Sequence, residues 1–222
     1  MKYIEKQKGN FPVIISVPHG GFLLPKNFKD RERGCFLRDD NLIPLLVAIK
    51  KELLTLGLTP YSIYSNIDRR KVDLNRSLVE AQESKKGKIT WRLYHKTIDQ
   101  YFDEILEKYK KGLYIDLHGQ STNDFIEIGY GQKDYSNFIS RKFFGFWLER
   151  EGLSSFPSPS ITQIKGRYRS GGYSLLSHRR RGIFSMQIEV NILARKSSKS
   201  IASFSEKFSK ALISYMKDRG FI

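Results

Sequence analysis

The sequence predicts an α/β protein with a mostly parallel sheet that helices cover on both faces. Short apolar runs of β-forming residues alternate along the chain with longer amphipathic stretches. Parallel strands need crossover connections, which are usually helices, so this alternation is typical of such sheets. The 222 residues contain neither a repeat nor a linker-like segment, which predicts one domain over residues 1–222.

Five apolar runs are expected to form strands and four amphipathic stretches are expected to form helices. The expected strands cover residues 11–17, 59–67, 113–119, 124–131 and 184–191. The expected helices cover residues 41–57, 90–112, 137–152 and 200–220. At the first helix, we expect Asp39 or Asp40 as the N-cap and Gly57 as the stop.

Positive charge dominates the composition, with 39 Lys and Arg against 23 Asp and Glu, a net charge of +16. Such an excess can mark a nucleic-acid partner. The basic residues are scattered, however, apart from "SHRRRG" and "ARKSSKS", and they accompany no nucleic-acid-binding signature. A small anionic substrate is the other use of a positive potential, and we expect it in preference to nucleic acid.

Several sequence features bear on location. No apolar run reaches the roughly 18 residues of a membrane-spanning helix, and the first ten residues are too polar for a secretory signal. The single cysteine, Cys35, rules out an internal disulfide and a zinc site with several cysteines. These features predict a cytoplasmic protein that has no membrane partner.

Two histidines stand at the ends of predicted strands, each followed by glycine: His19 in "SVPHGG" and His118 in "YIDLHGQ". Ligands bind beyond the carboxyl ends of parallel strands, where both residues fall. Imidazole is the commonest metal ligand, and glycine lets backbone or substrate approach closely. A single such histidine is usually structural, but the repeated pattern predicts a metal site.

A catalytic zinc site has three protein ligands and an open position, so a third His, Asp or Glu is needed. Asp40, or its neighbour Asp39, is the candidate, although either could simply cap the helix. Asp116 shares a strand face with His118 and could orient its imidazole. Glu189, in "MQIEVN", would be costly to bury unpaired, which suggests a general base unless it faces solvent from an edge strand.

Two polar segments could bind substrate. "VDLNRS" provides Asn75 and Arg76, and Arg can hold a carboxylate with two hydrogen bonds. "KGRYRSGGYSLLSH" provides Arg167, Arg169 and Tyr173 as anion-binding groups. An ordinary charged surface loop is the alternative for both segments.

In this order, the motifs resemble those of the N-formylglutamate amidohydrolase family. The similarity covers about residues 11–193. The matching stretches are "SVPHGGFLLP", "RDD", "VDLNRS", "RLYHKTI", "YIDLHGQ", "RSGGYSLLSH" and "MQIEVN". That family resembles the zinc carboxypeptidases, so the resemblance implies a zinc-carboxypeptidase-like (phosphorylase/hydrolase-like) fold with a mixed sheet between helices.

The resemblance also implies roles. His19 and His118 match the two histidine ligands, Glu189 matches the general base, and Asn75 with Arg76 matches the clamp for the substrate carboxylate. The carboxypeptidases have a Glu ligand three residues after the first His. Phe22 stands at that position here, so the third ligand must come from elsewhere.

The sequence therefore predicts a zinc-dependent amidohydrolase, or one using another divalent metal, that cleaves an amide bond of an anionic N-acyl amino acid such as N-formylglutamate. Two alternatives stay open at this point. One is a non-catalytic protein that binds RNA or another polyanion on the same scaffold. The other is a zinc peptidase or amidase that acts on cell-wall peptides.

Overall fold

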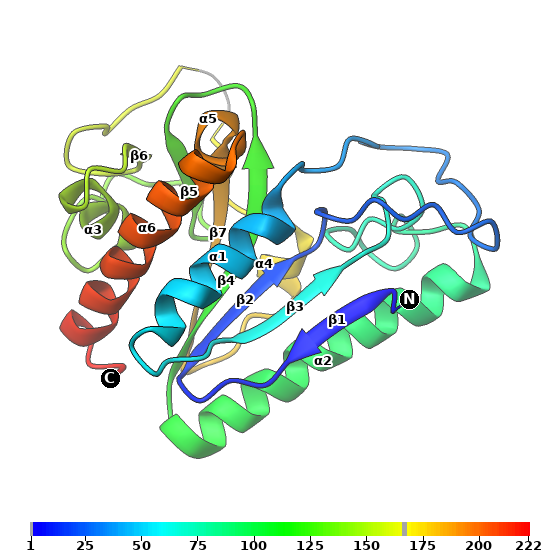
Figure 1. Ribbon diagram of the computed structural model, residues 1–222, viewed down its shortest axis with the longest axis horizontal. Helices are drawn as coiled ribbons and strands as arrows, with labels where there is room; N and C mark the ends of the chain where they lie inside the picture. Colours follow the sequence, from blue (N-terminus) through cyan, green and yellow to red (C-terminus); the bar gives the residue numbers. More distant parts are fainter. Residues whose placement is uncertain (1, 166–167) are drawn as a thin grey trace.

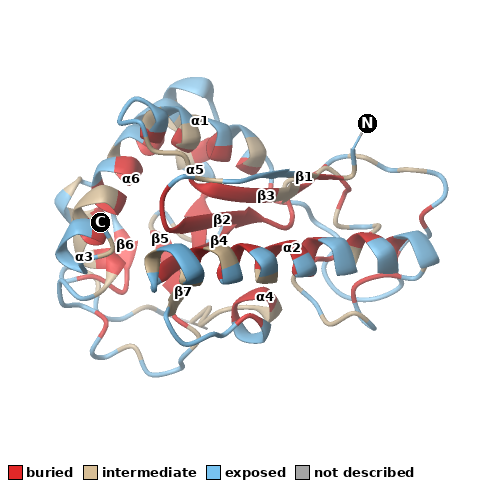
Figure 2. Ribbon diagram, turned by 90° about the horizontal axis from the view of Figure 1, so that it is seen from below, coloured by how far each residue is buried: buried red, intermediate tan, exposed pale blue. Residues whose placement is uncertain are grey.

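One mixed sheet lies between two layers of helices in the computed structural model, which describes residues 2–165 and 168–222 (Figures 1 and 2). The strands of the described residues are β1 (Ile4–Gln7), β2 (Val13–Val17), β3 (Tyr61–Ser65), β4 (Gly112–Gln120), β5 (Ile126–Gly129), β6 (Ser155–Phe156) and β7 (Ile183–Asn191). The helices are α1 (Leu42–Leu54), α2 (Lys85–Tyr109), α3 (Phe144–Arg150), α4 (Tyr173–Ser177), α5 (Ile192–Arg195) and α6 (Ser198–Asp218).

The strand order in the sheet is β1-β3-β2-β4-β7-β5-β6. The central strands are parallel: β2 pairs with β3 and β4, and β4 pairs with β7. β5 and β6 are parallel to each other, whereas β1 runs antiparallel to β3 and β5 runs antiparallel to β7. The predicted α/β fold with a mostly parallel, mixed sheet is therefore confirmed. The carboxyl ends of β2, β4 and β7 meet at one edge of this sheet.

The two faces of the sheet differ in chemistry because successive side chains of a strand point to opposite faces. One face carries Val13, Ile15, Leu113, Ile115 and Ile188, which belong to the larger apolar core. α1, α3 and α6 pack against this face (Figure 2). Burying one such side chain contributes roughly 1.5–3 kcal/mol, so this face supplies much of the stability.

The opposite face, on the side of α2 and α4, is apolar only in part. Ile14 and Ile63 pack against α2 there, in a second and smaller core. Toward the carboxyl ends of the strands, polar side chains replace the apolar ones on this face: Ser16, Asp116, His118, Gln187 and Glu189 are all buried. Buried polar groups need partners, so this half of the face is organised by hydrogen bonds and ion pairs rather than by apolar packing.

Several details differ from the expected elements. The stretch 137–152 was expected to be one helix, but only α3 forms within it. The N-cap of α1 is Asn41, with φ of 62°, so the expected capping by Asp39 or Asp40 is wrong. Gly57 does follow the helix end, with φ of 72°, and its amide donates to the carbonyl of Leu54 at 2.9 Å. The short elements β1, β6, α4 and α5 were not anticipated.

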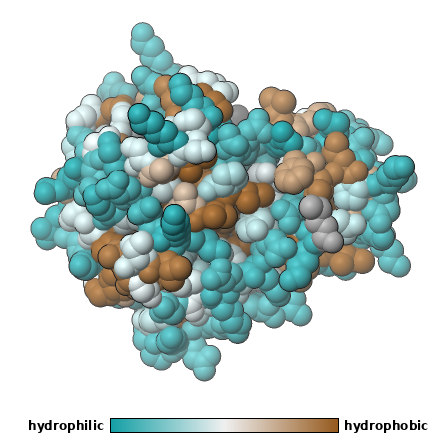
Figure 3. Space-filling view, viewed as in Figure 1, coloured by the Kyte–Doolittle hydropathy of each residue, from teal (hydrophilic) through white to brown (hydrophobic). Residues whose placement is uncertain are grey.

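Hydrophilic residues cover most of the molecular face shown in Figure 3, and hydrophobic residues gather there only in small patches. Among the described residues, no helix combines the length and the apolar character that crossing a membrane requires.

Candidate metal centre and active-site cleft

The structure brings His19 and His118 together at the carboxyl edge of the sheet. His19 follows β2, and His118 lies near the end of the neighbouring strand β4. Their ring centroids are 4.8 Å apart. The exposed fractions are only 1% and 3%, so both imidazoles are removed from bulk water.

A buried carboxylate holds the Nε2 atom of each ring. His19 Nε2 lies 2.7 Å from Asp73 Oδ1, and His118 Nε2 lies 3.0 Å from Asp116 Oδ2. An ionised carboxylate can only accept hydrogen bonds, so in both contacts the ring nitrogen donates. In a neutral imidazole this leaves Nδ1 with a free lone pair, which is the arrangement that carboxylate–histidine–metal sites use.

Both Nδ1 atoms face the same carboxylate oxygen. Asp39 Oδ2 lies 3.6 Å from Nδ1 of His19 and 3.5 Å from Nδ1 of His118. The amide of Gly119 donates to that oxygen at 3.0 Å and fixes its position. Two ring nitrogens and one carboxylate oxygen therefore converge on one small volume.

Asp40, the first choice from the sequence, does not join this group. Its side chain is 58% exposed, and it accepts a hydrogen bond from Arg38 Nε at 2.5 Å. A backbone hydrogen bond explains why Asp39, and not Asp40, lies at the site. The amide of Asp39 donates to the carbonyl of His19 at 2.9 Å. This bond places Asp39 beside the histidines, and Asp40 follows on the solvent side.

The donor set fits a divalent metal such as zinc. Tetrahedral zinc with ligand bonds of about 2.0–2.2 Å places its ligand atoms about 3.3–3.6 Å apart, which matches both distances to Asp39. In addition, Nδ1 of His19 is buried and has no hydrogen-bond partner among the described residues. A buried nitrogen in this state is costly unless something binds it.

The electrostatics of the group also favour a cation. Burial alone would raise the pKa of Asp39, but the two facing imidazoles hold that pKa below its ordinary value. Burial opposes charge on His118, yet the carboxylates of Asp116 and Asp39 raise its pKa well above the usual range. Surroundings that favour a proton on an imidazole also favour a divalent ion in its place.

Asp73 is one of the residues at this site to which the sequence assigned no role. It is fully buried and contacts His19, Arg69 at 2.9 Å and Arg31 at 3.5 Å. Burial would raise its pKa, but His19 and the two guanidinium groups lower it. Asp73 is the carboxylate of "VDLNRS", where attention went to the Asn and Arg that follow it.

Glu189 lies in the same cleft, on β7 opposite His118 in the strand register. Its exposed fraction is 8%, and Gln187 Nε2 donates to its carboxylate at 2.7 Å. Burial raises the pKa of Glu189, although the nearby His118 opposes this effect. A carboxylate with a raised pKa that faces a candidate metal centre is suited to taking up and releasing a proton.

The cleft has a volume of about 360 Å³, and a second cavity of about 440 Å³ adjoins it. Arg69, Asn75 and Arg169 line both cavities, so the two adjoin at these side chains. Arg76 and Tyr173 line only the second cavity. The expected substrate-binding residues therefore gather on one side of the metal centre, and Arg69, which the sequence reasoning missed, joins them.

Neighbouring groups fix the orientations of Asn75 and Arg169. Asn75 Oδ1 accepts from the amide of Ser174 at 2.8 Å, and its Nδ2 lies 3.3 Å from Nε2 of His118. Arg169 Nη1 donates to the fully buried Glu127 at 2.6 Å. Glu127 was missed, although a carboxylate within the apolar run "DFIEIG" is the same signal that identified Glu189. Arg167 lies outside the described residues.

Gly20 and Gly119, which follow the two histidines, have different structural roles. A Cβ atom at Gly20 would lie 2.9 Å from Cγ1 of Ile43, so this glycine lets α1 pack closely. A Cβ atom at Gly119 would lie 2.6 Å from Cζ of the buried Arg195. Arg195 donates to the carbonyls of Gln120 and Val190, both at 3.3 Å, and to that of Asp40.

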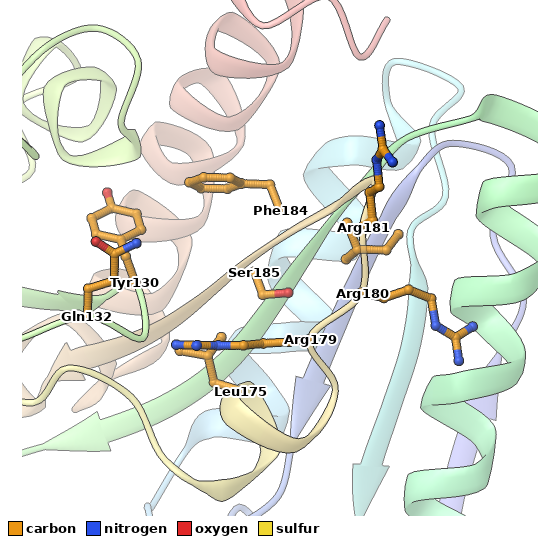
Figure 4. A pocket seen from close by; sticks show the side chains of 9 residues that line it. Tyr130, Gln132, Leu175, Arg179, Arg180, Arg181, Phe184 and Ser185 are labelled. Atoms are coloured by element: carbon orange, nitrogen blue, oxygen red, sulfur yellow. The ribbon is translucent and has the colours of Figure 1, made fainter.

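The arginine run of "SHRRRG" lines a different cavity, of about 410 Å³, near the start of β7. Figure 4 shows Arg179, Arg180 and Arg181 pointing in three different directions. Arg179 donates to the carbonyl of Gly131, and Arg180 pairs with Asp103. The three guanidinium groups do not converge on one small anion, and two of them are already hydrogen-bonded within the chain.

No family model matches the sequence, and no curated protein matches it. Among solved structures, the chain is similar to an N-formylglutamate amidohydrolase from Ralstonia eutropha JMP134, with a TM-score of 0.68, 13% identity and 100% of both chains covered. A gene product of Agrobacterium tumefaciens gives a TM-score of 0.67 at 11% identity, with 99% of this chain and 97% of that one covered.

A protein from Burkholderia mallei, provisionally described as a carboxypeptidase, gives a TM-score of 0.53 at 11% identity, with 97% of this chain and 59% of that one covered. At such identities the similarity establishes the fold. The chain has the α/β fold of zinc-carboxypeptidase-like proteins, which is the fold that the resemblance to the N-formylglutamate amidohydrolase family implied.

Proposed function

We propose that this chain is a metal-dependent amidohydrolase that cleaves the amide bond of an anionic N-acyl amino acid, with N-formylglutamate as the first compound to test. One observation carries the proposal. Nδ1 of His19, Nδ1 of His118 and Oδ2 of Asp39 converge while carboxylates hold both Nε2 atoms, and Glu189 lies in the same cleft. The similarity of fold to an N-formylglutamate amidohydrolase supports it.

In this proposal His19, Asp39 and His118 hold the metal, with Asp39 in the place first considered for Asp40. A divalent ion, when bound there, supplies Lewis acidity that polarises an amide carbonyl and acidifies water. Asp73 and Asp116 keep the two imidazoles in the tautomer that leaves Nδ1 free. These residues thus prepare the donor set before any substrate arrives.

Glu189 acts as the general base and then as the general acid. It takes a proton from the attacking water and returns it to the leaving nitrogen. Burial raises the pKa of Glu189, so it accepts that proton more readily than an exposed carboxylate would. Activity should therefore fall as the pH drops through this raised pKa, because protonated Glu189 cannot act as a base.

The arginines that line the two adjoining cavities bind the anionic part of the substrate. Arg69 and Arg169 line both cavities, and Arg76 lies farther out with a half-exposed side chain. Asn75 adds an amide beside His118. A substrate carboxylate among these groups would position the amide bond next to Glu189.

Replacing Glu189 with Gln tests the proposal, because the amide keeps the shape of the side chain and cannot take up the proton. We expect hydrolysis of a panel of N-formyl, N-acetyl and N-succinyl amino acids to fall by about 10²–10⁴-fold. The metal content, measured by elemental analysis, should stay at the wild-type level. Glu107→Gln, at an exposed position of α2, is the matched control.

Full activity in Glu189→Gln would overturn the assignment of the base. A wild-type protein that binds no zinc and hydrolyses nothing in the panel would overturn the proposed function itself. Including muramyl peptides in the panel separates the cell-wall amidase alternative from hydrolysis of small N-acyl amino acids.

A further inference from the structure

We infer that Gln187 is a positioning residue that orients Glu189 and couples this orientation to the glycine-rich loop at residues 168–172. The inference rests on the proposed function, in which Glu189 moves the proton. Gln187 lies on β7, two residues before Glu189 and on the same face of the sheet. Its exposed fraction is 4%, and the sequence analysis gave it no role.

Both ends of the Gln187 amide are hydrogen-bonded. Its Nε2 donates to Glu189 Oε1 at 2.7 Å, and its Oε1 accepts from the backbone amide of Gly172 at 2.6 Å. A carboxylate can only accept and a backbone amide can only donate, so only this orientation of the side-chain amide satisfies both partners. Gln187 therefore links a loop amide to the catalytic carboxylate.

The sheet holds the same loop at a second point. The backbone amide of Arg169 donates to the carboxylate of Glu127, whose other oxygen accepts from Arg169 Nη1 at 2.6 Å. Glu127 pairs with Glu189 in the register of β5 and β7, so the anchor lies directly beside the general base. Two buried side chains, Glu127 and Gln187, thus fix the loop above these strands.

The start of α4, just after the loop, makes a third contact of this kind. The amide of Ser174 donates to Asn75 Oδ1 at 2.8 Å, and the other end of Asn75 approaches His118. The packing here is close, because a Cβ atom at Gly172 would lie 2.2 Å from Nδ2 of Asn75. Movement of the loop would therefore disturb Gln187 and Asn75 together.

The coupling has a functional consequence. Arg169 and Tyr173, two of the expected substrate-binding residues, lie on the segment that donates these hydrogen bonds. A substrate that orders this segment would also secure the donor to Glu189. Small misplacements of a catalytic group can lower the rate by about 100-fold, so the contact should affect turnover more than binding.

The experiment compares two replacements of Gln187. Gln187→Met keeps the length of the side chain and removes both hydrogen bonds. Gln187→Glu keeps an acceptor for Gly172 but, while ionised, offers no donor to Glu189 and places a second negative charge beside it. We measure kcat, KM, metal content and the hydrogen-exchange rate of the Gly172 amide by NMR. Gln100→Met, at an exposed position of α2, is the control and should match the wild type in every readout.

In Gln187→Met we expect kcat to fall by about 10–100-fold. KM should change less than threefold. The metal content should stay unchanged, and the Gly172 amide should exchange at least about tenfold faster. In Gln187→Glu, slow exchange should return while kcat stays low. A low kcat together with slow exchange of the Gly172 amide would show that the loss of activity comes from the orientation of Glu189 and not from a loosened loop. If Gln187→Met does not fold, Gln187→Glu alone carries the test through kcat and exchange.

Wild-type kcat in either variant would overturn the inference, and so would unchanged exchange of the Gly172 amide in Gln187→Met. Failure of the proposed function has a different signature. In that case the wild type hydrolyses nothing, while the exchange measurement still reports whether Gln187 holds the loop.

Discussion

The molecule contains two buried pairs of histidines, and they differ in what their ring nitrogens face. In the first pair, carboxylates bind the Nε2 atoms of His19 and His118, and both Nδ1 atoms point to a third carboxylate. In the second pair, His95 Nδ1 and His178 Nε2 lie 2.6 Å apart and bind each other. All four exposed fractions are between 1% and 6%, so burial does not distinguish the pairs.

The rings of the second pair bind each other and one carboxylate, and Nε2 of His95 is buried without a hydrogen-bond partner among the described residues. His178 Nδ1 lies 2.9 Å from Asp99, and the ring of His95 packs against the rings of Trp91 and His178. Burial and the neighbouring His178 lower the pKa of His95 to about 3, which keeps this ring neutral. Three ligand atoms converge at the first pair, and in the part of the chain that the structure describes no such group includes His95 or His178. This convergence, rather than burial or a single unpartnered nitrogen, distinguishes the candidate metal centre from the second pair.

The largest expected difference between the pairs is in metal content. Wild-type protein, purified without chelator and supplied with zinc, should hold about one ion per chain, and His118→Ala should hold none because two ligands do not suffice. His178→Ala, in the other pair, should keep the ion. Elemental analysis of the three proteins decides the matter. Equal metal in all three would contradict the assignment of the centre.

A smaller effect is expected from the carboxylates behind the rings. Asp73→Asn or Asp116→Asn should weaken zinc binding by about 10–100-fold, because an amide no longer enforces the tautomer with a free Nδ1. Competition with a chromophoric chelator measures this change. Asp99→Asn, which alters the carboxylate behind the second pair, is the control. A loss of affinity in the control as large as in the test variants would argue for a general effect on folding.

The smallest expected effect is on the pH dependence of the free energy of unfolding. His95 has an ordinary pKa of about 6.5 in the unfolded chain and about 3 in the folded one. Between these values only the unfolded chain binds the proton, so the free energy of unfolding should decrease by about 1.4 kcal/mol for each unit that the pH falls below 6.5. His95→Gln should lack this contribution. Urea unfolding at pH 6.5 and pH 5 compares the slopes, and equal slopes would contradict the prediction.

The sequence identified the long strands and the histidines because those signals are local. The apolar runs of β2, β4 and β7 are long enough to recognise, and both histidines sit where such runs end. α4, with five residues, has too little pattern to detect. The sequence could not separate Asp39 from Asp40, because tertiary hydrogen bonds to His19 and Gly119 make that choice.

The sequence also did not indicate that His95 and His178 form a pair. His95 and His178 are 83 positions apart, on α2 and just after α4, and no local rule places them together. Glu127 was missed because its partner, Arg169, comes from a distant segment of the chain. Arg69 pairs with the nearby Asp73, but its place in the cleft beside Glu189 and Arg169 depends on the fold. The histidines at the strand ends could be identified from the sequence. The residues that contact and support them could be identified only from the fold.

The close approach of Gly119 and Arg195 has a consequence for how this protein can evolve. Any side chain at position 119 would collide with the guanidinium group, so a replacement of Gly119 requires the buried Arg195 side chain to move or to become smaller. A smaller residue at position 195 would in turn leave the carbonyls of Asp40, Gln120 and Val190 without their donor. A replacement at either position therefore disturbs the contacts of the other, so the two positions restrict each other.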